Sequence, residues 1–462
     1  AQKDVKVQQS YIQTKGGSLK ATWEFFVRTR GNHFHAHVTA DGNRLVALGD
    51  LVARASYTAF QLGDSPLNAR RVQLVDPENK HASPYGWHNI GDGKRYTSTF
   101  GNNVAAYAKT GGEANSPKQY ARNYHLNFDF PLEIAGDPSS YQYAAITNSF
   151  VGANMLHDLT YIYGFNEVAG NFQYNNWGKG GKGNDAMQVV VHDPDEDEPY
   201  FDPYPDGERS YLILPIYGKG GLRRDSNLDS SVITHEYSHG VSSRLTGGPH
   251  RVDCFSKTIQ AGGVSEGTSD FFAYLVSMRK EDKPTTWKHM GEYAKGSPMR
   301  LYPYTTENTL KFSHINQWQS SIHKTGNVWG SILFDLYWEL VRELGFTEDL
   351  YTRQLTKGNT LALQIVINSL KETPCHPTFL SARSALFEAE QELTGGKHIC
   401  KLWTAFAKRG LGTMARMEGS RAVDDFTLPQ ACIAAAAATA TTTESTANPS
   451  RKWGLFQKMR FW

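Results

Sequence analysis

The sequence predicts an α+β protein of two lobes, with a β-rich N-terminal half followed by a mainly helical C-terminal half. The chain has 462 residues, more than the roughly 100 to 200 residues of one ordinary domain. From about Ser56 to Asn227, short apolar runs alternate with Gly, Pro, Asn and Asp residues, a pattern typical of strands joined by turns. After Leu228 the apolar residues recur at helical spacing in long segments.

The first part of the chain resembles a small antiparallel unit. Residues 19–53 alternate apolar and polar side chains, with a polar turn at Arg30-Gly31-Asn32 and a tight turn at Asp41-Gly42. In the following β-rich region the runs 72–75 and 187–191 are expected to be strands, and apolar spacing over residues 144–159 predicts one helix.

The second half of the chain is expected to consist mainly of helices. Their predicted ranges are 232–245, 267–278, 326–344, 361–370, 378–393 and 402–409. Beyond them, residues 433–450 have the Ala/Thr-rich composition of a flexible linker. The aromatic and basic residues of 451–462 suit either contact with an anionic membrane or partner, or a disordered tail. The chain therefore divides at 1–55, 56–227, 228–432 and 433–462.

Charge and hydropathy exclude several classes of protein. The 48 basic and 46 acidic residues nearly cancel to a net charge of +2, which disfavours a nucleic-acid-binding protein. No apolar run approaches the roughly 20 residues that span a bilayer. The start, Ala1-Gln2-Lys3-Asp4, lacks the order of a signal peptide, so either the protein is cytosolic or the chain begins after a processed segment.

The four cysteines show no CxxC spacing, so a zinc knuckle or a thioredoxin motif is not available. We expect one or two disulfides formed in an oxidising compartment, with Cys375 to Cys400 as the favoured pair. The alternative is a set of four unrelated buried thiols.

The central chemical signal is the run His235-Glu236-Tyr237-Ser238-His239 at the start of an apolar-periodic helix. Two histidines four residues apart project from one face of a helix and can bind one metal ion through their imidazole nitrogens. Zinc in such a site lowers the pKa of a bound water toward about 7. Glu236 borders the same site and is the candidate general base that takes the proton of that water and passes it to the leaving amine.

A second motif supplies the missing ligand. In the stretch 262–270, Glu266 is expected at the start of a second helix and Asp270 one turn later on the same face. Glu266 can complete a His2Glu zinc site, while Asp270 can accept the free ring N–H of a ligating histidine. The alternative is an exposed polar helix face beside an unrelated acidic helix N-terminus, and the second motif makes it improbable.

The metal-site helix, with HEYSHG followed by SSRLTGG, resembles that of the fungalysins, secreted metallopeptidases related to thermolysin. The resemblance spans roughly residues 15 to 415. Further stretches in the family's order are 155–158, 163–165, 170–173, 266–272, 302–304, 322–326, 374–375 and 406–412.

This resemblance implies a thermolysin-like two-lobe gluzincin fold with an active-site cleft between the lobes. It implies a secreted, extracellular zinc endopeptidase, acting on protein or peptide substrates and made as a zymogen that its own propeptide inhibits; a monomer is expected. Residues 1–55 resemble the C-terminal part of that inhibitory propeptide. Residues 56–227 and 228–432 then correspond to the β-rich and helical catalytic lobes.

The family pattern also gives His323 a role. This residue lies in a polar run before the helix expected from Gly326, and an imidazole N–H aimed at the developing oxyanion would stabilise the tetrahedral intermediate. The alternative is a surface histidine with a structural role.

The sequence departs from the family around the substrate. Residues 193–206, including Tyr200, replace an Asn/Ala-rich edge that in relatives pairs with the substrate backbone. Thr268 stands where relatives usually carry an aromatic residue, and no tyrosine between His239 and Glu266 can serve as a second oxyanion donor. Arg244 and Tyr302 are the candidate substitutes.

The acidic run of residues 193–202 offers carboxylates that suit Ca²⁺, although a solvated acidic loop is the favoured interpretation. Of the functional hypotheses, an active endopeptidase comes first. The competitors are a non-catalytic relative with a structural zinc, whose altered edge or aromatic tail binds a host protein or membrane, and a latent zymogen. The intact Glu236 favours an active enzyme, because a structural zinc site needs no base.

Overall fold

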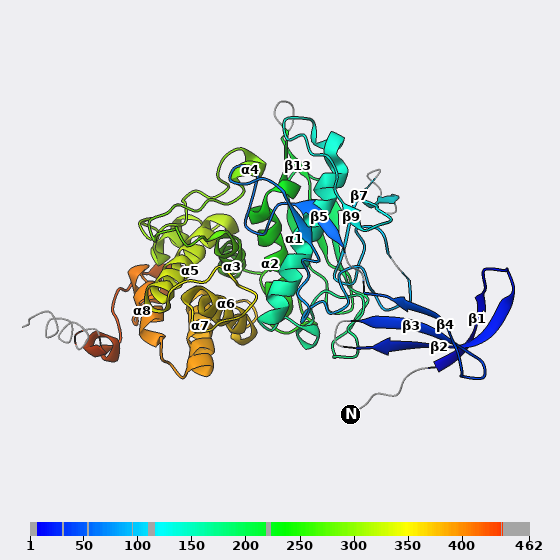
Figure 1. The fold of residues 1–462 in the computed structure, drawn as a ribbon. Coiled ribbons are helices and arrows are strands. Elements are labelled where there is room, and N and C mark those ends of the chain that lie inside the picture. Colours follow the sequence, from blue (N-terminus) through cyan, green and yellow to red (C-terminus); the bar gives the residue numbers. More distant parts are fainter. Residues whose placement is uncertain are drawn as a thin grey trace, which may run out of the picture.

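The computed structural model describes residues 7–29, 32–52, 55–94, 96–109, 116–218, 223–435 and 437. It shows a small N-terminal sheet, a β-rich region with one long helix, and a helical half (Figure 1). The predicted α+β architecture is therefore confirmed. The aromatic-basic tail of residues 451–462, and nearly all of the linker before it, lie outside the described residues.

The N-terminal sheet is antiparallel and has the order β1-β2-β3-β4. Its strands are Val7–Gln13, Leu19–Arg28, His33–Thr39 and Leu45–Asp50; the first of these was not predicted. The sheet projects from one end of the molecule (Figure 1). It is anchored by His33, which is 1% exposed and packs against Tyr85 and Trp177, and by Asn89, whose amide donates to the Leu51 carbonyl over 2.8 Å.

The β-rich region contains a five-stranded sheet in the order β11-β12-β10-β7-β8. In chain order these strands are Val104–Lys109, Lys118–Gln119, Met187–Val191, Tyr200–Asp202 and Tyr211–Leu214. The central strand β10 is parallel to both of its neighbours, whereas the edge strands β11 and β8 are antiparallel. A smaller sheet joins β6 (Val72–Val75), β5 (Ser56–Ala59) and β9 (Asn127–Phe128).

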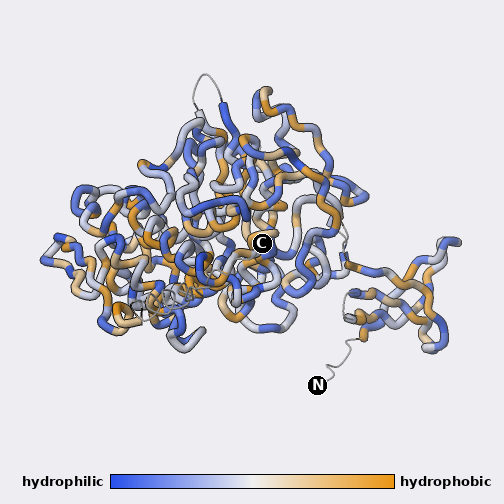
Figure 2. The backbone as a smooth tube through the Cα atoms, turned by 60° about the vertical axis from the view of Figure 1, so that its left-hand side comes forward, coloured by the Kyte–Doolittle hydropathy of each residue, from blue (hydrophilic) through white to orange (hydrophobic). Residues whose placement is uncertain are grey.

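Helix α1, Gln142–Ile162, is buried along most of its length and packs against β5, β7, β10 and helix α2. Both sheets and the helical half share one continuous apolar core, which includes Tyr57, Phe150, Phe271 and Phe406. Apolar and polar segments alternate throughout the body (Figure 2). No helix in the described residues has the length and apolar character needed to cross a membrane. The two halves are thus held together by packing across this shared core.

The helical half begins at residue 230. Its main helices are α2 Ser230–Leu245, α3 Ile259–Ser277, α5 Ile322–Leu344, α6 Gly358–Glu372, α7 Phe379–Thr394 and α8 Ile399–Lys408. Minor elements are α4 Glu292–Lys295, the pair β13 Ile216–Tyr217 and β14 Arg224–Asp225, the pair β15 Arg416–Glu418 and β16 Arg421–Val423, and the 3-10 turns Pro138–Tyr141, Glu167–Ala169, Ser226–Leu228 and Phe312–Gln317.

Helices α3 and α5 begin eight and four residues earlier than predicted, at Ile259 and Ile322. Glycines explain the difference. A Cβ on Gly267 would lie 2.5 Å from backbone atoms of α5. A Cβ on Gly326 would lie 2.4 Å from the Cβ atom of Glu266. These glycines therefore occur because the two helices approach closely, and they do not mark a loop.

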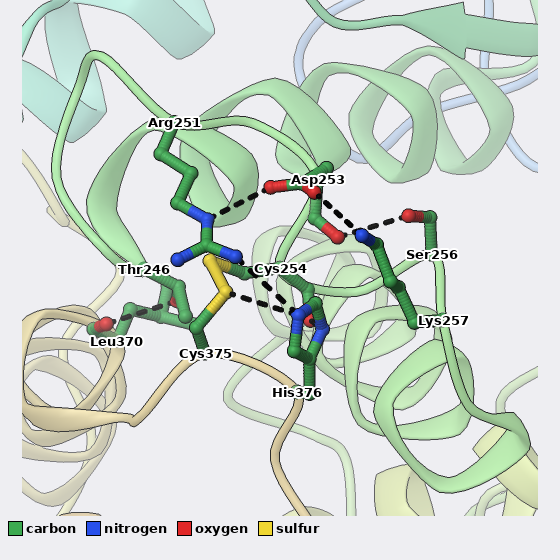
Figure 3. Close-up of a disulfide and its surroundings, with 9 residues drawn as sticks. All are labelled: Thr246, Arg251, Asp253, Cys254, Ser256, Lys257, Leu370, Cys375 and His376. Atoms are coloured by element: carbon green, nitrogen blue, oxygen red, sulfur yellow. Dashed lines mark hydrogen bonds and ion pairs between the residues drawn. A yellow bond between two sulfur atoms is a disulfide. The ribbon is translucent and has the colours of Figure 1, made fainter.

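The cysteine pairing differs from the expectation. Cys254 bonds to Cys375, and Cys400 bonds to Cys432, so the expected pair Cys375 to Cys400 was wrong. The first bridge joins the loop after α2 to the loop after α6, two segments 121 residues apart whose Cα atoms lie 4.5 Å apart (Figure 3). The cysteines pair according to which loops the fold brings together. Their spacing along the sequence did not indicate which loops those are.

Candidate metal centre and cleft

Helix α2 carries His235, Glu236 and His239 into the cleft. Its N-terminus is fixed by Asp229, whose carboxylate accepts from the Ser231 amide over 3.0 Å and, through its other oxygen, from the Ala294 amide over 3.1 Å. This cap satisfies backbone donors that a helix start leaves unpaired. The side chains that follow two turns later therefore project from a firmly held helix.

The structure brings His235, His239 and Glu266 together. The two imidazole Nε2 atoms lie 3.1 Å apart. Each lies near a different carboxylate oxygen of Glu266: Nε2 of His235 is 3.4 Å from Oε2, and Nε2 of His239 is 3.5 Å from Oε1. Zinc bonds of about 2.0 to 2.2 Å in a tetrahedral arrangement separate neighbouring ligand atoms by about 3.3 Å. The donor set and its spacing therefore fit one zinc ion.

The other nitrogens of both imidazoles face polar neighbours. Nδ1 of His235 lies 2.7 Å from Oδ1 of Asp270, as the sequence led us to expect. Nδ1 of His239 lies 3.0 Å from the Ser265 hydroxyl and 3.2 Å from that of Ser269. Partners of this kind hold a metal-binding imidazole in one orientation, so Nε2 of each ring is the atom left for an ion.

Glu266 lies in the middle of α3, and the expectation that it begins a helix was wrong. The helix starts at Ile259, where the Thr258 side chain caps it by accepting from the Ala261 amide over 3.1 Å. Glu266 and Asp270 still share one helix face, as predicted, because they are four residues apart.

Arg300 is a site residue that the sequence reasoning missed. Its guanidinium donates to both carboxylate oxygens of Asp270, over 2.6 and 2.9 Å, and to Glu266 over 3.0 Å. Burial alone would raise the pKa of Asp270, but Arg300 and His235 outweigh it and lower that pKa to about 2. Arg300 thus keeps the buried carboxylates ionised. It follows α4 in a segment without a recognisable motif, so no local pattern pointed to it.

Glu236 lies beside this cluster and is 7% exposed. Burial raises the pKa of its carboxyl to about 7, although His235 opposes the shift. The residue borders the same cavities as His235 and His323. A carboxylate that titrates near neutral pH can both accept and release a proton.

His323 lies in the first turn of α5, where Ser321 caps the helix; it does not precede the helix as expected. Its Nε2 is 3.6 Å from Oε2 of Glu266, and its side chain is 58% exposed. The imidazole therefore borders the metal-binding cluster and remains open to a molecule bound in the cleft.

Of the remaining predicted residues, Tyr200 reaches the cleft and two others do not. Tyr200 lies on β11, lines the cleft and donates to Glu196 over 3.2 Å. Arg244 is 1% exposed. Its guanidinium donates hydrogen bonds to the Asp185 carboxylate and to the carbonyls of Tyr204, Gly170 and Glu208.

Tyr302 packs its ring near Trp318, with the centroids 6.5 Å apart. The backbone of Tyr302 exchanges hydrogen bonds with the Asn327 side chain. The occupied guanidinium of Arg244 leaves no donor for an oxyanion, so that suggestion is corrected. Tyr302 is not among the residues that line the cavities beside Glu236. A different tyrosine, Tyr217 on β13, borders the cavity beside Glu236 and Arg300.

The main groove over the centre has a volume of about 490 Å³ and is lined by β11, α2, α3 and the start of α5. Strand β11 is an edge strand that pairs with β12 on one side. Glu196 and Glu198 lie on the rim. In the described part of the chain, the carboxylates of residues 193–202 form no three-ligand group, and Asp193 pairs with Lys109 over 2.8 Å. The calcium suggestion thus finds no support.

Comparisons with known proteins agree with this geometry. A family described as fungalysin metallopeptidase (M36) matches residues 56–415. An extracellular metalloproteinase MEP of Pyricularia oryzae is 39% identical over 432 residues, covering 89% of this chain and 67% of the relative. One from Leptosphaeria maculans is 35% identical, covering 93% and 70%. The extracellular metalloproteinase 5 of Arthroderma benhamiae is 35% identical, covering 94% and 70%.

Proposed function

The chain belongs to the fungalysin metallopeptidase family, and from this premise we propose that His235, His239 and Glu266 bind one zinc ion while Glu236 serves as the general base. The protein is a secreted metalloendopeptidase that hydrolyses peptide bonds, as its family and its relatives named as extracellular metalloproteinases indicate. The observation that carries the proposal is the spacing of the ligand atoms: the two imidazole Nε2 atoms lie 3.1 Å apart, Nε2 of His235 lies 3.4 Å from Oε2 of Glu266, and Nε2 of His239 lies 3.5 Å from Oε1.

The residues around these three ligands have complementary tasks. Zinc, when bound, lowers the pKa of a coordinated water and polarises the substrate carbonyl. The Glu236 carboxylate accepts a proton from the attacking water and delivers it to the leaving nitrogen. Asp270 holds the imidazole of His235, and Arg300 supplies the positive charge that keeps Asp270 and Glu266 ionised. His323 donates to the developing oxyanion, a role that its open position beside Glu266 supports.

Tyr217 is the proposed second donor to that oxyanion, in place of Arg244 and Tyr302. It borders the same cavity as Glu236. Edge strand β11 is the proposed alignment surface for a protein or peptide substrate, because an extended chain can add to a free sheet edge through backbone hydrogen bonds. Tyr200 on this strand would then contact the substrate's side chains.

Residues 1–55 are proposed to be the C-terminal part of the inhibitory propeptide. Support comes from the start of the family match at residue 56 and from the separate sheet that β1 to β4 form at one end of the molecule. Removal of this segment by cleavage near residue 55 would then release the mature enzyme.

The decisive test replaces Glu236 with Gln. The substitution preserves size and removes the basic carboxylate, so casein cleavage should fall at least 10³-fold while zinc content stays at one ion per chain in the peptidase centre. The control, Glu388→Gln, alters an exposed glutamate of α7 and should change neither quantity. Undiminished cleavage by the Glu236 variant would show that another residue is the base.

A further inference from the structure

The N-terminal sheet carries a second cluster of metal-binding side chains, far from the peptidase centre in sequence. Strand β3 presents His35 and His37 two residues apart, hence on the same face of the sheet. Glu24 of β2 lies directly opposite His37 in the antiparallel register, which places its carboxylate on that face too. We propose that Glu24, His35 and His37 form a site for a divalent transition-metal ion such as Zn²⁺.

The distances support coordination of one ion. Nε2 of His35 lies 2.7 Å from Oε1 of Glu24, and the rings of His35 and His37 are 4.6 Å apart between centroids. One ligand atom from each of the three residues lies within 4.8 Å of the other two. Shifts below about 1 Å would bring these atoms to the roughly 3.3 Å spacing of a tetrahedral zinc site.

Neighbouring residues hold the three ligands much as they would in a metal site. The Thr22 hydroxyl lies 3.2 Å from Nδ1 of His37, which leaves Nε2 of that ring for an ion. Gln8 on β1 donates to the outer oxygen of Glu24 over 3.0 Å, which leaves the inner oxygen. Phe26 stacks on the ring of His35 with the centroids 4.6 Å apart. Each ligand is therefore oriented by a side chain of an adjacent strand.

The chemistry of the cluster also favours a metal. The side chains of His35 and Glu24 are 24% and 14% exposed, so an ion can enter while most competing water is excluded. Two imidazoles and one carboxylate are a donor set that zinc and copper accept. Such an ion would cross-link β2 and β3.

This site differs from the peptidase centre in its place in the chain. It lies before residue 56, where the match to the fungalysin family begins, and no element of the peptidase cleft contributes to it. Zinc bound there would stabilise the N-terminal sheet and would leave the chain together with that segment after processing.

The experiment counts zinc in the full chain, carrying Glu236→Gln so that it does not digest itself. After equilibration with buffered micromolar free Zn²⁺ and gel filtration, the parent should hold two zinc ions per chain by mass spectrometry of the metal. His35→Gln and His37→Gln should each hold one. His235→Ala should also hold one, and combination with His35→Gln should remove both. A control, His125→Ala, changes an exposed histidine elsewhere and should keep two.

A titration with Co²⁺ gives a second measurement. The parent should bind in two steps, and the weaker step should require at least tenfold more Co²⁺, or vanish, in His35→Gln. Circular dichroism of each variant checks that the chain is folded. One zinc ion in the parent, or two in both His35→Gln and His37→Gln, would overturn the proposal. A parent holding two ions that cleaves casein despite Glu236→Gln would refute the proposed general base and leave this second site standing.

Discussion

Gly326→Ala tests whether the close approach of α3 and α5 sets the position of Glu266. The added Cβ would lie 2.4 Å from Cβ of Glu266 and 3.0 Å from the Gly267 amide nitrogen. Ordinary contacts begin near 3.4 Å, so the helices must separate by roughly 1 Å. Such overpacking costs about 1 to 3 kcal/mol, offset in part by the better helix propensity of Ala, worth about 1 kcal/mol.

The larger effect should be on the metal centre. Zinc sites tolerate deviations of about 0.2 Å in ligand distance, so a shift of Glu266 by several times that amount should weaken zinc binding at least tenfold. Competition with a chromophoric chelator measures the affinity, and thermal unfolding followed by circular dichroism measures the stability. We expect the melting temperature to fall by a few degrees.

The matched control is Gly152→Ala in α1, where the new Cβ would lie 3.4 and 3.6 Å from side-chain atoms of Ile233. This is ordinary contact, so the variant should keep its zinc affinity and be unchanged or slightly stabilised. If Gly326→Ala matched the parent in both zinc affinity and melting temperature, the argument that helix contact positions the ligand would be refuted.

Further predictions concern single groups around the centre. Asp270→Asn should weaken zinc binding 10- to 100-fold by chelator competition. Since the pKa of Asp270 is lowered to about 2, its stabilising contribution is full above pH 4 and lost toward pH 2, so the variant should show a flatter decline of melting temperature over that range; a parallel decline would contradict this. His323→Phe should lower kcat/KM about 10²-fold at unchanged zinc content; full activity would exclude His323 as an oxyanion donor. Arg300→Met should lower the free energy of unfolding, measured with urea, by about 3 to 5 kcal/mol, because the buried carboxylates of Asp270 and Glu266 lose their partner. An unchanged urea midpoint would count against this pairing. Replacing Cys254 and Cys375 together by Ser should lower the free energy of unfolding by about 2 to 5 kcal/mol. Urea unfolding curves that coincide for the parent and this variant would argue against a stabilising role of the disulfide.

Local sequence patterns predicted the helices and the main strands well. The runs 72–75 and 187–191 are strands β6 and β10 as expected, because alternation and short apolar runs depend on near neighbours. The start of α3 was misplaced because Gly262 and Gly263 look like a loop in sequence. Their real cause, packing against Ile322 and Thr325, lies some sixty residues away along the chain.

The same limit explains the site residues that were missed or misassigned. His235, His239 and Glu266 follow spacing rules on helices, and these rules need no tertiary information. Arg300 reaches the cleft from a segment outside the helices and strands, and Tyr217 from the two-residue strand β13, so only the folded chain shows where they lie. Arg244 sits on the same helix as the histidines but turns toward Asp185; helical position alone did not reveal that its donors were already occupied.

The order in which the centre's parts occur along the chain has a consequence for synthesis. The imidazoles and the carboxylate of the proposed zinc site come from α2 and α3, which are consecutive helices and pack on each other. His323 lies on α5, which begins at Ile322, well after α3 ends at Ser277. A nascent chain that has emerged only to the end of α3 therefore already contains every proposed zinc ligand and Tyr217, but it lacks Arg300 and His323. On this order, the zinc ligands are complete before the groups proposed to ionise the carboxylates and to stabilise the oxyanion.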